Sequence, residues 1–277
     1  MDKNSDRRQA LNSDWGAEGS GSAAYFNLVS SDYFGRYEEQ SPGGYAFRVR
    51  KQRILELLDG CGGRALDVGC GPGVLVPDLL DRAFEVWGVD AAPNMINECH
   101  KNFSQEPKAH FSVGDATEID FPAGSFDVVI CAGVIDHIRD HERAIAEMLR
   151  VLRIDGTLIV AFPNFFSLSA WWRNYVFYRT VRILRPSYYA LLGRPQPPAL
   201  GSLATLHSER AVRRVMERNR GDVSDVVYYN FNPVVSPLDE IFPATTVRLA
   251  ERLERFRAGW LKRLGCGFLV KVRKRES

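Results

Sequence analysis

Short apolar segments alternate with amphipathic segments from residue 48 to residue 163, and this alternation limits the fold more than any other feature. The apolar segments have the length of strands, and the amphipathic segments have helical spacing. Strands and helices that alternate through short links predict a parallel sheet with right-handed crossovers. The expected elements are helix 48–58, strand 65–68, helix 74–80, strand 83–90, helix 91–103, strand 110–115, strand 125–133, helix 140–156 and strand 157–163.

The alternation breaks after Pro163. Residues 165–205 are rich in aromatic side chains and arginine, and we expect an aromatic helical cap inserted after the fifth strand. Regular structure then returns as helix 208–219, strand 225–232, helix 245–256 and strand 267–274. The predicted fold is α/β and Rossmann-like, with a mostly parallel sheet of seven strands and helices on both faces. The predicted divisions are a mobile tail 1–22, a cofactor-binding core 23–164 with N-terminal helices, the cap 165–205 and a C-terminal part of the core 206–277.

Composition excludes several classes of protein. The chain has 277 residues, of which 45% are hydrophobic and 25% charged, as expected of a soluble globular protein. Its net charge of +2 is too small to indicate nucleic-acid binding. The five cysteines form no C-x-x-C pair, and the first 22 residues contain no apolar segment for export or membrane insertion. We therefore expect a cytoplasmic protein.

The stretch "ALDVGCGPGVL" ends the first predicted strand with a carboxylate and three closely spaced glycines. The second and third strands also end in aspartates, Asp90 and Asp115. Because ligands of parallel sheets bind beyond the carboxyl ends of the strands, these aspartates and the glycine turn are expected to line one crevice. Asp90 can accept both hydroxyls of a ribose, and Asp115 with Ala116 can meet the edge of an adenine.

The glycine spacing favours one of two possible ligands. A dinucleotide site needs G-x-G-x-x-G, but here the pattern is G-x-G-x-G and Val74 stands at the third glycine position. No basic residue lies in the turn to meet a phosphate, while Asp67 suits a ligand with positive groups. S-adenosylmethionine carries an ammonium, a sulfonium, a ribose and an adenine, and no phosphate. The pattern therefore favours it over a nicotinamide dinucleotide.

Four segments at consistent intervals resemble the successive motifs of class I S-adenosylmethionine-dependent methyltransferases. They are "ALDVGCGPGVL", "VWGVDAAPNMI", "FSVGDATEIDFPAGSFDVVICAGVIDHI" and "EMLRVLRIDGTLIVAFPN". The chain is most similar to the small-molecule type that includes the ubiquinone-pathway O-methyltransferases. The resemblance covers about residues 48–164, and it implies that a seventh, antiparallel strand lies between the fifth and the sixth.

The resemblance also implies which residues bind the cofactor. Those for the methionine portion are Asp67, Gly69, Cys70, Gly71, Gly73 and Ala132, with Arg50 as a candidate for the carboxylate. Asp90 corresponds to the ribose ligand, and the adenine would meet Ala91, Met95, Asp115 and Ala116. Similar enzymes fold their N-terminal region over the cofactor and substrate, which makes Tyr45 a candidate for substrate binding.

His137 follows the fourth strand and is the candidate catalytic residue. Similar methyltransferases carry a histidine near the acceptor, and imidazole suits removal of a proton from a hydroxyl acceptor. The alternative is a structural histidine that packs the loop. His137 and His141 flanked by Asp136 and Asp140 could also suggest a metal site, but two histidines without a third ligand do not favour one, and no metal is predicted.

The aromatic residues of the cap allow three interpretations. Trp171 and Tyr175 have helical spacing and are candidates for an apolar acceptor pocket under a lid. Packing against the core and contact with a membrane surface are the alternatives, although arginines on the same arc do not favour the membrane.

The predicted function is transfer of a methyl group from S-adenosylmethionine to oxygen or nitrogen of a small aromatic or lipophilic molecule. The alternatives are a non-catalytic scaffold or regulatory protein that binds the cofactor and an oxidoreductase that uses a nicotinamide cofactor. The acceptor and the oligomeric state stay open.

Overall fold

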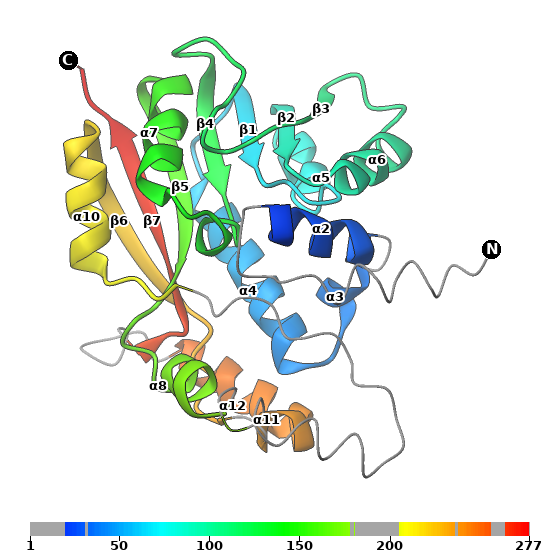
Figure 1. The fold of residues 1–277 in the computed structure, drawn as a ribbon, viewed down its shortest axis with the longest axis vertical. Coiled ribbons are helices and arrows are strands. Elements are labelled where there is room, and N and C mark those ends of the chain that lie inside the picture. Colours follow the sequence, from blue (N-terminus) through cyan, green and yellow to red (C-terminus); the bar gives the residue numbers. More distant parts are fainter. Residues whose placement is uncertain are drawn as a thin grey trace.

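The computed structural model describes residues 20–30, 33–177, 180, 205–235, 238–255 and 264–276. A seven-stranded sheet runs through these residues, with helices on both of its faces (Figure 1). The strands are β1 (Arg64–Val68), β2 (Glu85–Asp90), β3 (Ala109–Val113), β4 (Phe126–Cys131), β5 (Leu152–Pro163), β6 (Gly221–Tyr229) and β7 (Gly267–Lys274). The helices are α2 (Ser20–Val29), α3 (Gly35–Glu38), α4 (Pro42–Leu57), α5 (Val76–Asp81), α6 (Pro93–Asn102), α7 (His141–Val151), α8 (Leu168–Trp171), α10 (Glu209–Arg218), α11 (Leu238–Ile241) and α12 (Pro243–Arg255).

The strand order is β3-β2-β1-β4-β5-β7-β6. The neighbours among β1 to β5 pair in parallel, whereas β7 runs antiparallel to both β5 and β6 and lies between them. The predicted Rossmann-like sheet, with its C-terminal antiparallel strand between the fifth and sixth, is therefore confirmed. The order reverses direction at β1 and β4, so the crevice expected at a topological switch point falls beyond the carboxyl ends of these strands.

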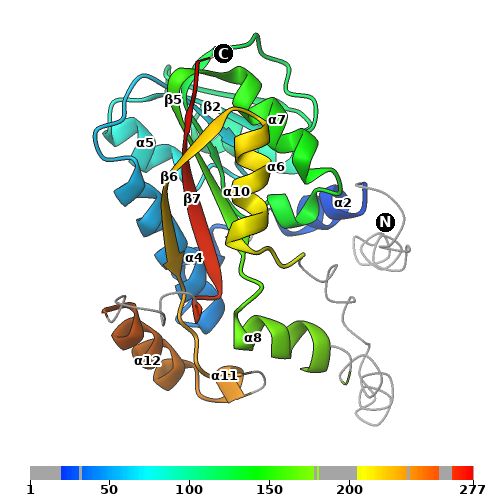
Figure 2. The same cartoon turned by 90° about the vertical axis from the view of Figure 1, so that its left-hand side faces the viewer.

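Both faces of the sheet are buried, which explains the continuous apolar runs of the central strands. On one face, α7 and α10 pack on β4, β5 and β7 through side chains such as Met148, Val215 and Met216. On the other face, α4, α5 and α12 cover β1, β4 and β5 through Ile54, Leu79 and similar residues. Figure 2, which looks toward β6 and β7, shows α10 and α4 on opposite sides of the sheet.

The helix predicted for residues 140–156 ends earlier than expected. Asp140 caps it by accepting a hydrogen bond from the Arg143 backbone N–H (3.0 Å), but α7 stops at Val151 and β5 begins at Leu152. Leu152 pairs with Phe126 of β4, and the register then shifts before Thr157. The prediction was wrong for residues 152–156 because "LRIDG" continues the helical spacing, while pairing with β4 determines the conformation.

The N-terminal helices lie across the carboxyl ends of the strands (Figure 1). The helix predicted from residue 48 begins at Pro42, because Ser41 accepts a hydrogen bond from the Gly44 N–H (3.0 Å) and Pro42 stands at its first turn. Of the predicted mobile tail 1–22, residues 20–22 belong to α2, and residues 1–19 lie outside the described residues.

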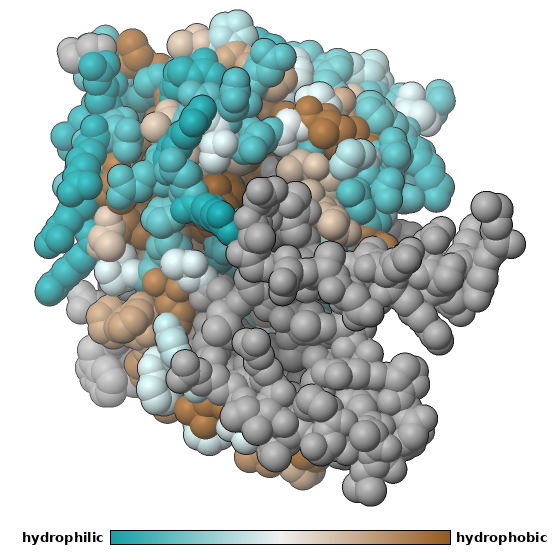
Figure 3. Space-filling model, viewed as in Figure 1, coloured by the Kyte–Doolittle hydropathy of each residue, from teal (hydrophilic) through white to brown (hydrophobic). Residues whose placement is uncertain are grey.

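Only part of the predicted cap is described. It contains α8 and a π-helical turn, Trp172–Phe177, and residues 178–179 and 181–204 lie outside the described residues. In Figure 3 hydrophilic side chains gather over α7 and α10, and apolar ones appear at the lower end of the molecule, where α8, α11 and α12 lie. Among the described residues, the most exposed large apolar side chains are Leu168, Ile241, Phe242 and Phe166.

Candidate active site

The turn after β1 has the backbone geometry that its glycines allow. Gly69, Gly71 and Gly73 have φ angles of +73°, +55° and +89°, a region that other residues rarely adopt. A Cβ on Gly69 would overlap the side chain of Val134, whereas a Cβ on Gly71 would meet only Tyr33, at 3.9 Å. The backbone at Gly71 is therefore open to a ligand.

Asp90 joins the glycine turn to the end of β2. Its Oδ2 accepts a hydrogen bond from the Gly71 N–H (2.9 Å), and its Oδ1 accepts one from the Ala92 N–H (2.8 Å). Burial raises the pKa of this carboxyl, and the two backbone N–H groups oppose the rise by stabilising the charged form. The carboxylate is held in place, and each oxygen keeps a lone pair for a further donor.

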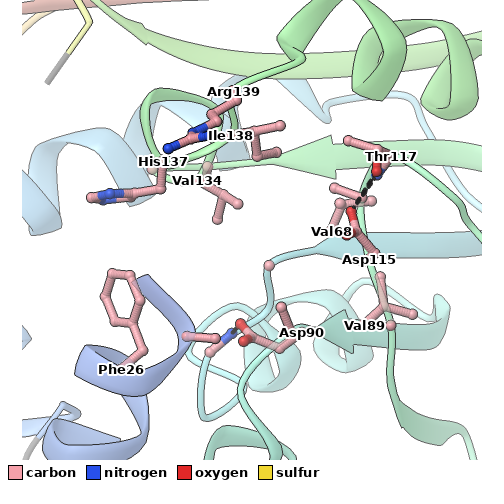
Figure 4. Close-up of a pocket in the computed structure, with 18 of the residues that line it drawn as sticks. Phe26, Val68, Val89, Asp90, Asp115, Thr117, Val134, His137, Ile138 and Arg139 are labelled. Carbon is pink, nitrogen blue, oxygen red and sulfur yellow. Dashed lines mark hydrogen bonds between the residues drawn. The ribbon is translucent and has the colours of Figure 1, made fainter. Parts of the chain in front are cut away.

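A cavity of about 340 Å³ lies beyond the strand ends, between α2 and the loop that follows β4. Figure 4 shows Asp90 in the middle of it, with Phe26 and His137 toward one end and Asp115 and Thr117 toward the other. The predicted site residues that line it are Gly69, Gly71, Asp90, Ala91, Asp115, Ala116, Ala132 and His137. Its size is that of an ordinary small-molecule site.

Asp115 is exposed and has a local structural role as well. It follows β3 and accepts hydrogen bonds from the Thr117 N–H (2.7 Å) and the Thr117 hydroxyl (2.8 Å). This is the turn geometry typical of aspartate. Ala116 is buried beside it and forms part of the cavity wall.

A second cavity, of about 30 Å³, lies against the glycine turn and shares part of its lining with the larger one. It brings Arg50, Asp67 and Cys70 together with Tyr33 and Tyr37. Asp67 is only 3% exposed, and burial, together with the charge of Asp90, raises its pKa to about 7, while Arg50 opposes the rise. This end of the site therefore holds one carboxylate and one guanidinium with little access to water.

Arg50 is enclosed by aromatic side chains and by backbone. Its guanidinium lies over the Phe47 ring (5.1 Å) and directly against Gly133, whose φ is +82°. Burial opposes its charge, but the nearby phenols of Tyr37, Tyr229 and Tyr33 outweigh this effect, so the pKa of Arg50 is raised.

His137 lies in a 3₁₀ turn, Ile135–His137, and its ring faces the cavity opposite α2. Its ring centroid is 5.3 Å from that of Phe26, edge to face, and its Nε2 is 3.9 Å from Oδ2 of Asp136. The imidazole therefore contacts an aromatic ring and lies near a carboxylate, at the end of the cavity far from Asp115 (Figure 4).

Five predicted site residues line neither cavity, and three of them lie in the core or on α4. Gly73 is buried and packs toward Phe103, and Met95 is 1% exposed within the core. Tyr45 lies in the first turn of α4, about 140° around the helix from Arg50, and faces α12. The carboxylates of Glu254 and Glu251 lie near its hydroxyl. Because α4 begins before Tyr45, this residue is part of the helix and lies on a different face from Arg50. The structure therefore does not bring Tyr45 to the site.

Trp171 and Tyr175 also lie away from both cavities. They belong to α8 and the π-helical turn, each is 46% exposed, and their ring centroids are 5.9 Å apart. A separate apolar cavity of about 280 Å³ lies nearby, lined by Leu168, Phe231 and Leu253 among others.

Sequence reasoning missed several residues of the site. Phe26, Tyr33 and Thr117 line the larger cavity, and Tyr33 lines both cavities. The signal for Phe26 and Tyr33 was present in the spaced aromatics of the N-terminal segment, but it did not show which ring faces the site.

Among the described residues, no group of three or more His, Cys, Asp or Glu side chains could hold a metal ion. His141 lies beside His207 instead, with ring centroids 5.2 Å apart. The five cysteines are free thiols, and none of the described helices has the length and apolar character needed to cross a bilayer.

Comparisons with known proteins agree with this geometry. Residues 66–160 match the family described as Methyltransferase domain. Phosphatidylethanolamine N-methyltransferase of Cereibacter sphaeroides is 30% identical over 113 residues, 40% of this chain and 55% of the relative. Demethylmenaquinone methyltransferase of Deinococcus radiodurans is 33% identical over 114 residues, 40% of this chain and 47% of the relative. The chain thus spans about half the length of these curated relatives.

A solved structure shares the whole fold. It is an S-adenosylmethionine-dependent methyltransferase of Thermotoga maritima, described as a possible histamine N-methyltransferase, with a TM-score of 0.59 and 17% identity. The similarity covers 90% of this chain and 98% of that one. Residues 66–160 are therefore similar to a methyltransferase domain, and the sheet has the fold of the class I S-adenosylmethionine-dependent methyltransferases. S-adenosylmethionine is the cofactor of that class.

Proposed function

We propose that the protein transfers the methyl group of S-adenosylmethionine to an oxygen or nitrogen of a small aromatic or lipophilic molecule. The observation that carries the proposal is the arrangement of three carboxylates, an open glycine turn and one guanidinium around two cavities that share part of their lining. This arrangement matches the charges of the cofactor, whose amino-acid part is zwitterionic and whose sulfur is cationic.

The residues present fit the cofactor along its length. Asp115 and Ala116 would meet the adenine, and the free lone pairs of Asp90 would accept the ribose hydroxyls. At the other end, Asp67 would face the ammonium and Arg50 the carboxylate, with Gly69, Gly71 and Ala132 close to the methionine chain. When bound, the cofactor supplies a methyl group that its sulfonium already activates. The protein then has to align the acceptor and exclude water.

Phe26 and His137 would form the acceptor side of the site. They lie at the end of the cavity opposite the proposed adenine position (Figure 4). His137 would take the proton of a hydroxyl acceptor, or orient an amine, because its ring is held by Phe26 and Asp136. The names of the relatives, which include a phospholipid N-methyltransferase and a quinone-pathway methyltransferase, support a lipophilic acceptor.

The direct test is to incubate purified protein with isotopically methyl-labelled S-adenosylmethionine and a cell extract, followed by mass spectrometry. We expect the wild-type protein to produce a labelled small molecule and the Asp90→Ala protein to produce none. Binding of S-adenosylhomocysteine without any labelled product would instead indicate a scaffold that binds the cofactor, and failure to bind it would overturn the proposal.

His137→Gln tests the acceptor side. It should lower turnover of the labelled product by about 10² to 10⁴-fold, the usual contribution of a general base, while leaving the Kd of S-adenosylhomocysteine within about two-fold. His141→Gln, four residues further on, is the matched control. An equal loss of turnover and cofactor affinity in His137→Gln would show a structural role.

A further inference from the structure

The two cavities of the candidate site share four lining residues, Tyr33, Gly69, Gly71 and Ala132. Of these four, only Tyr33 has a side chain larger than a methyl group. Its Cε1 would lie 3.9 Å from a Cβ placed on Gly71, so the ring lies beside the open backbone of the glycine turn. The Tyr33 ring is therefore the one large side chain in the part of the wall that both cavities share.

Neighbouring side chains hold the Tyr33 ring in place. Its centroid lies 6.2 Å from that of Phe26, 6.1 Å from that of Phe47 and 6.4 Å from that of Tyr37. The Arg36 guanidinium lies 5.4 Å from the same centroid. Burial raises the pKa of the Tyr33 phenol to about 12, so the side chain stays uncharged near neutral pH. Tyr33 thus presents a fixed, neutral aromatic ring to the site.

The covalent structure of the cofactor determines which of its groups comes to this shared wall. S-adenosylmethionine has its sulfonium between its nucleoside and its amino-acid part. In the proposed function the nucleoside lies in the larger cavity and the amino-acid part in the smaller one. The sulfonium and its methyl group would then lie beside the residues that line both cavities, and Tyr33 is the aromatic residue among them. An aromatic ring attracts a nearby cation, and does so more strongly away from water.

We propose that the Tyr33 ring contacts the sulfonium and its methyl group, and so makes the site prefer the methyl donor to its neutral product, S-adenosylhomocysteine. The inference rests on the proposed function. Phe26 contacts both the Tyr33 ring and the His137 ring, the latter with centroids 5.3 Å apart. A row of three rings therefore leads from the proposed sulfonium position to the proposed acceptor side. Weaker binding of the neutral product would favour its exchange for a new donor.

The donor and its product together test this contact, because S-adenosylhomocysteine lacks only the methyl group and, with it, the positive charge on sulfur. Tyr33→Leu keeps an apolar side chain and removes the ring. We expect it to raise the Kd of S-adenosylmethionine about ten-fold and to leave that of S-adenosylhomocysteine within about two-fold. Tyr33→Phe keeps the ring and should leave both Kd values within about two-fold. Isothermal titration calorimetry measures all of them.

Tyr25→Leu is the matched control. Tyr25 lies on α2 and, like Tyr33, contacts Phe26 and Arg36: its ring centroid is 5.4 Å from that of Phe26, and its hydroxyl accepts a hydrogen bond from the Arg36 guanidinium (3.1 Å). It lines neither cavity. Tyr25→Leu should therefore leave the ratio of the two Kd values unchanged, even if looser packing of the N-terminal helices weakens both ligands.

The outcomes separate the two proposals. Wild-type protein that binds neither compound would overturn the proposed function, and this inference with it. Wild-type protein that binds both, with Tyr33→Leu weakening both equally or neither, would overturn the inference alone. A change of the Kd ratio in Tyr25→Leu as large as that in Tyr33→Leu would also overturn it, and so would an equal change in Tyr33→Phe, which would assign the effect to the hydroxyl.

Discussion

At the scale of single residues, Asp90 holds the glycine turn in place and is the residue proposed to bind the ribose. Each carboxylate oxygen accepts one backbone N–H, from Gly71 and from Ala92. In Asp90→Asn the amide NH₂ would face one of these donors, so that donor would lose its partner. Leaving a buried donor unpaired costs about 1–3 kcal/mol.

We therefore expect Asp90→Asn to lower the free energy of unfolding and to raise the Kd of S-adenosylhomocysteine at least about ten-fold, since the ribose also loses an acceptor. Asp81→Asn, at an exposed aspartate at the end of α5, is the control. The measurements are chemical denaturation and calorimetry. An unchanged Kd would show that Asp90 does not contact the ligand.

Asp67 should make the stability of the ligand-free protein depend on pH. Its pKa is raised from 3.8 to about 7 in the folded state, so between these values the folded protein holds a proton that the unfolded chain releases. The free energy of unfolding should therefore fall as pH rises from about 4 to about 7.

The Asp67→Asn variant carries no such proton and should lack this component. The test is urea denaturation of both proteins at several pH values. The contributions of the other titrating groups cancel in the difference between the two free energies of unfolding. Parallel profiles for the two proteins would contradict the raised pKa of Asp67.

The sequence alone indicates those residues of the candidate site whose positions follow from the order of strands and helices. Asp67, Asp90 and Asp115 could be predicted because strand ends of a parallel sheet meet at one edge, whatever the loops do. Tyr33 and Tyr45 both lie in the segment before the first strand, so the positions of the strand ends do not show which of them lines the site. That choice depends on where α4 begins. The cap at Ser41, seven residues before the predicted start at residue 48, makes Tyr45 part of the helix and places it about 140° around the helix from Arg50.

At the scale of elements, α2 is attached to the core through α6. Asn27 on α2 accepts a hydrogen bond from the Asn94 N–H (2.9 Å) and receives a second, from the Asn94 side chain, at its backbone oxygen (3.1 Å). The N-cap residue of α6, Ala92, offers no side-chain acceptor. Asn27 therefore caps the start of α6 from another helix, and the same contact holds α2 over the cavity.

Asn27→Ala should accordingly speed the dissociation of S-adenosylhomocysteine several-fold with little change in its association rate. Loss of a cap costs about 1 kcal/mol, which corresponds to roughly five-fold in rate. Stopped-flow measurement of both rates checks this, with Asn102→Ala at the other end of α6 as control. A change confined to the association rate would show that α2 does not retain the ligand.

Elements with a strong local pattern could be predicted from the sequence, and those that depend on distant partners could not. Residues 267–274 were placed correctly, because "GFLVKVRK" is a buried strand by composition alone. The start of β5 was misassigned because its pairing with Phe126 is a long-range contact. The cap at residues 165–205 has no matching pattern in the rest of the fold, which is why its role stayed open.

At the scale of the whole molecule, a buried ion pair joins the helix before the sheet to the helix before the last strand. Arg53 of α4 and Glu254 of α12 are 3.2 Å apart, and each side chain is 7% exposed. Oε1 of Glu254 also accepts a hydrogen bond from the Asn230 N–H (2.6 Å). The pair connects segments that are 201 residues apart in the chain.

Arg53→Met should lower the free energy of unfolding by about 3 kcal/mol, because it leaves the Glu254 carboxylate buried without its cation. Gln52→Met, at the exposed neighbouring position, should have little effect. Chemical denaturation followed by both circular dichroism and tryptophan fluorescence should show one coincident transition in each protein. Two separate transitions would show that α12 unfolds independently of α4.

The position of β7 has a consequence for how the protein is made. This strand separates β5 from β6, yet of the seven it is the last to leave the ribosome. During translation, the edge of β5 that pairs with β7 therefore stays unpaired while more than a hundred further residues are added. An unpaired apolar strand edge can pair with other nascent chains. Slow synthesis of the residues between β5 and β7 should therefore favour aggregation, and the yield of folded protein should depend on the supply of chaperones.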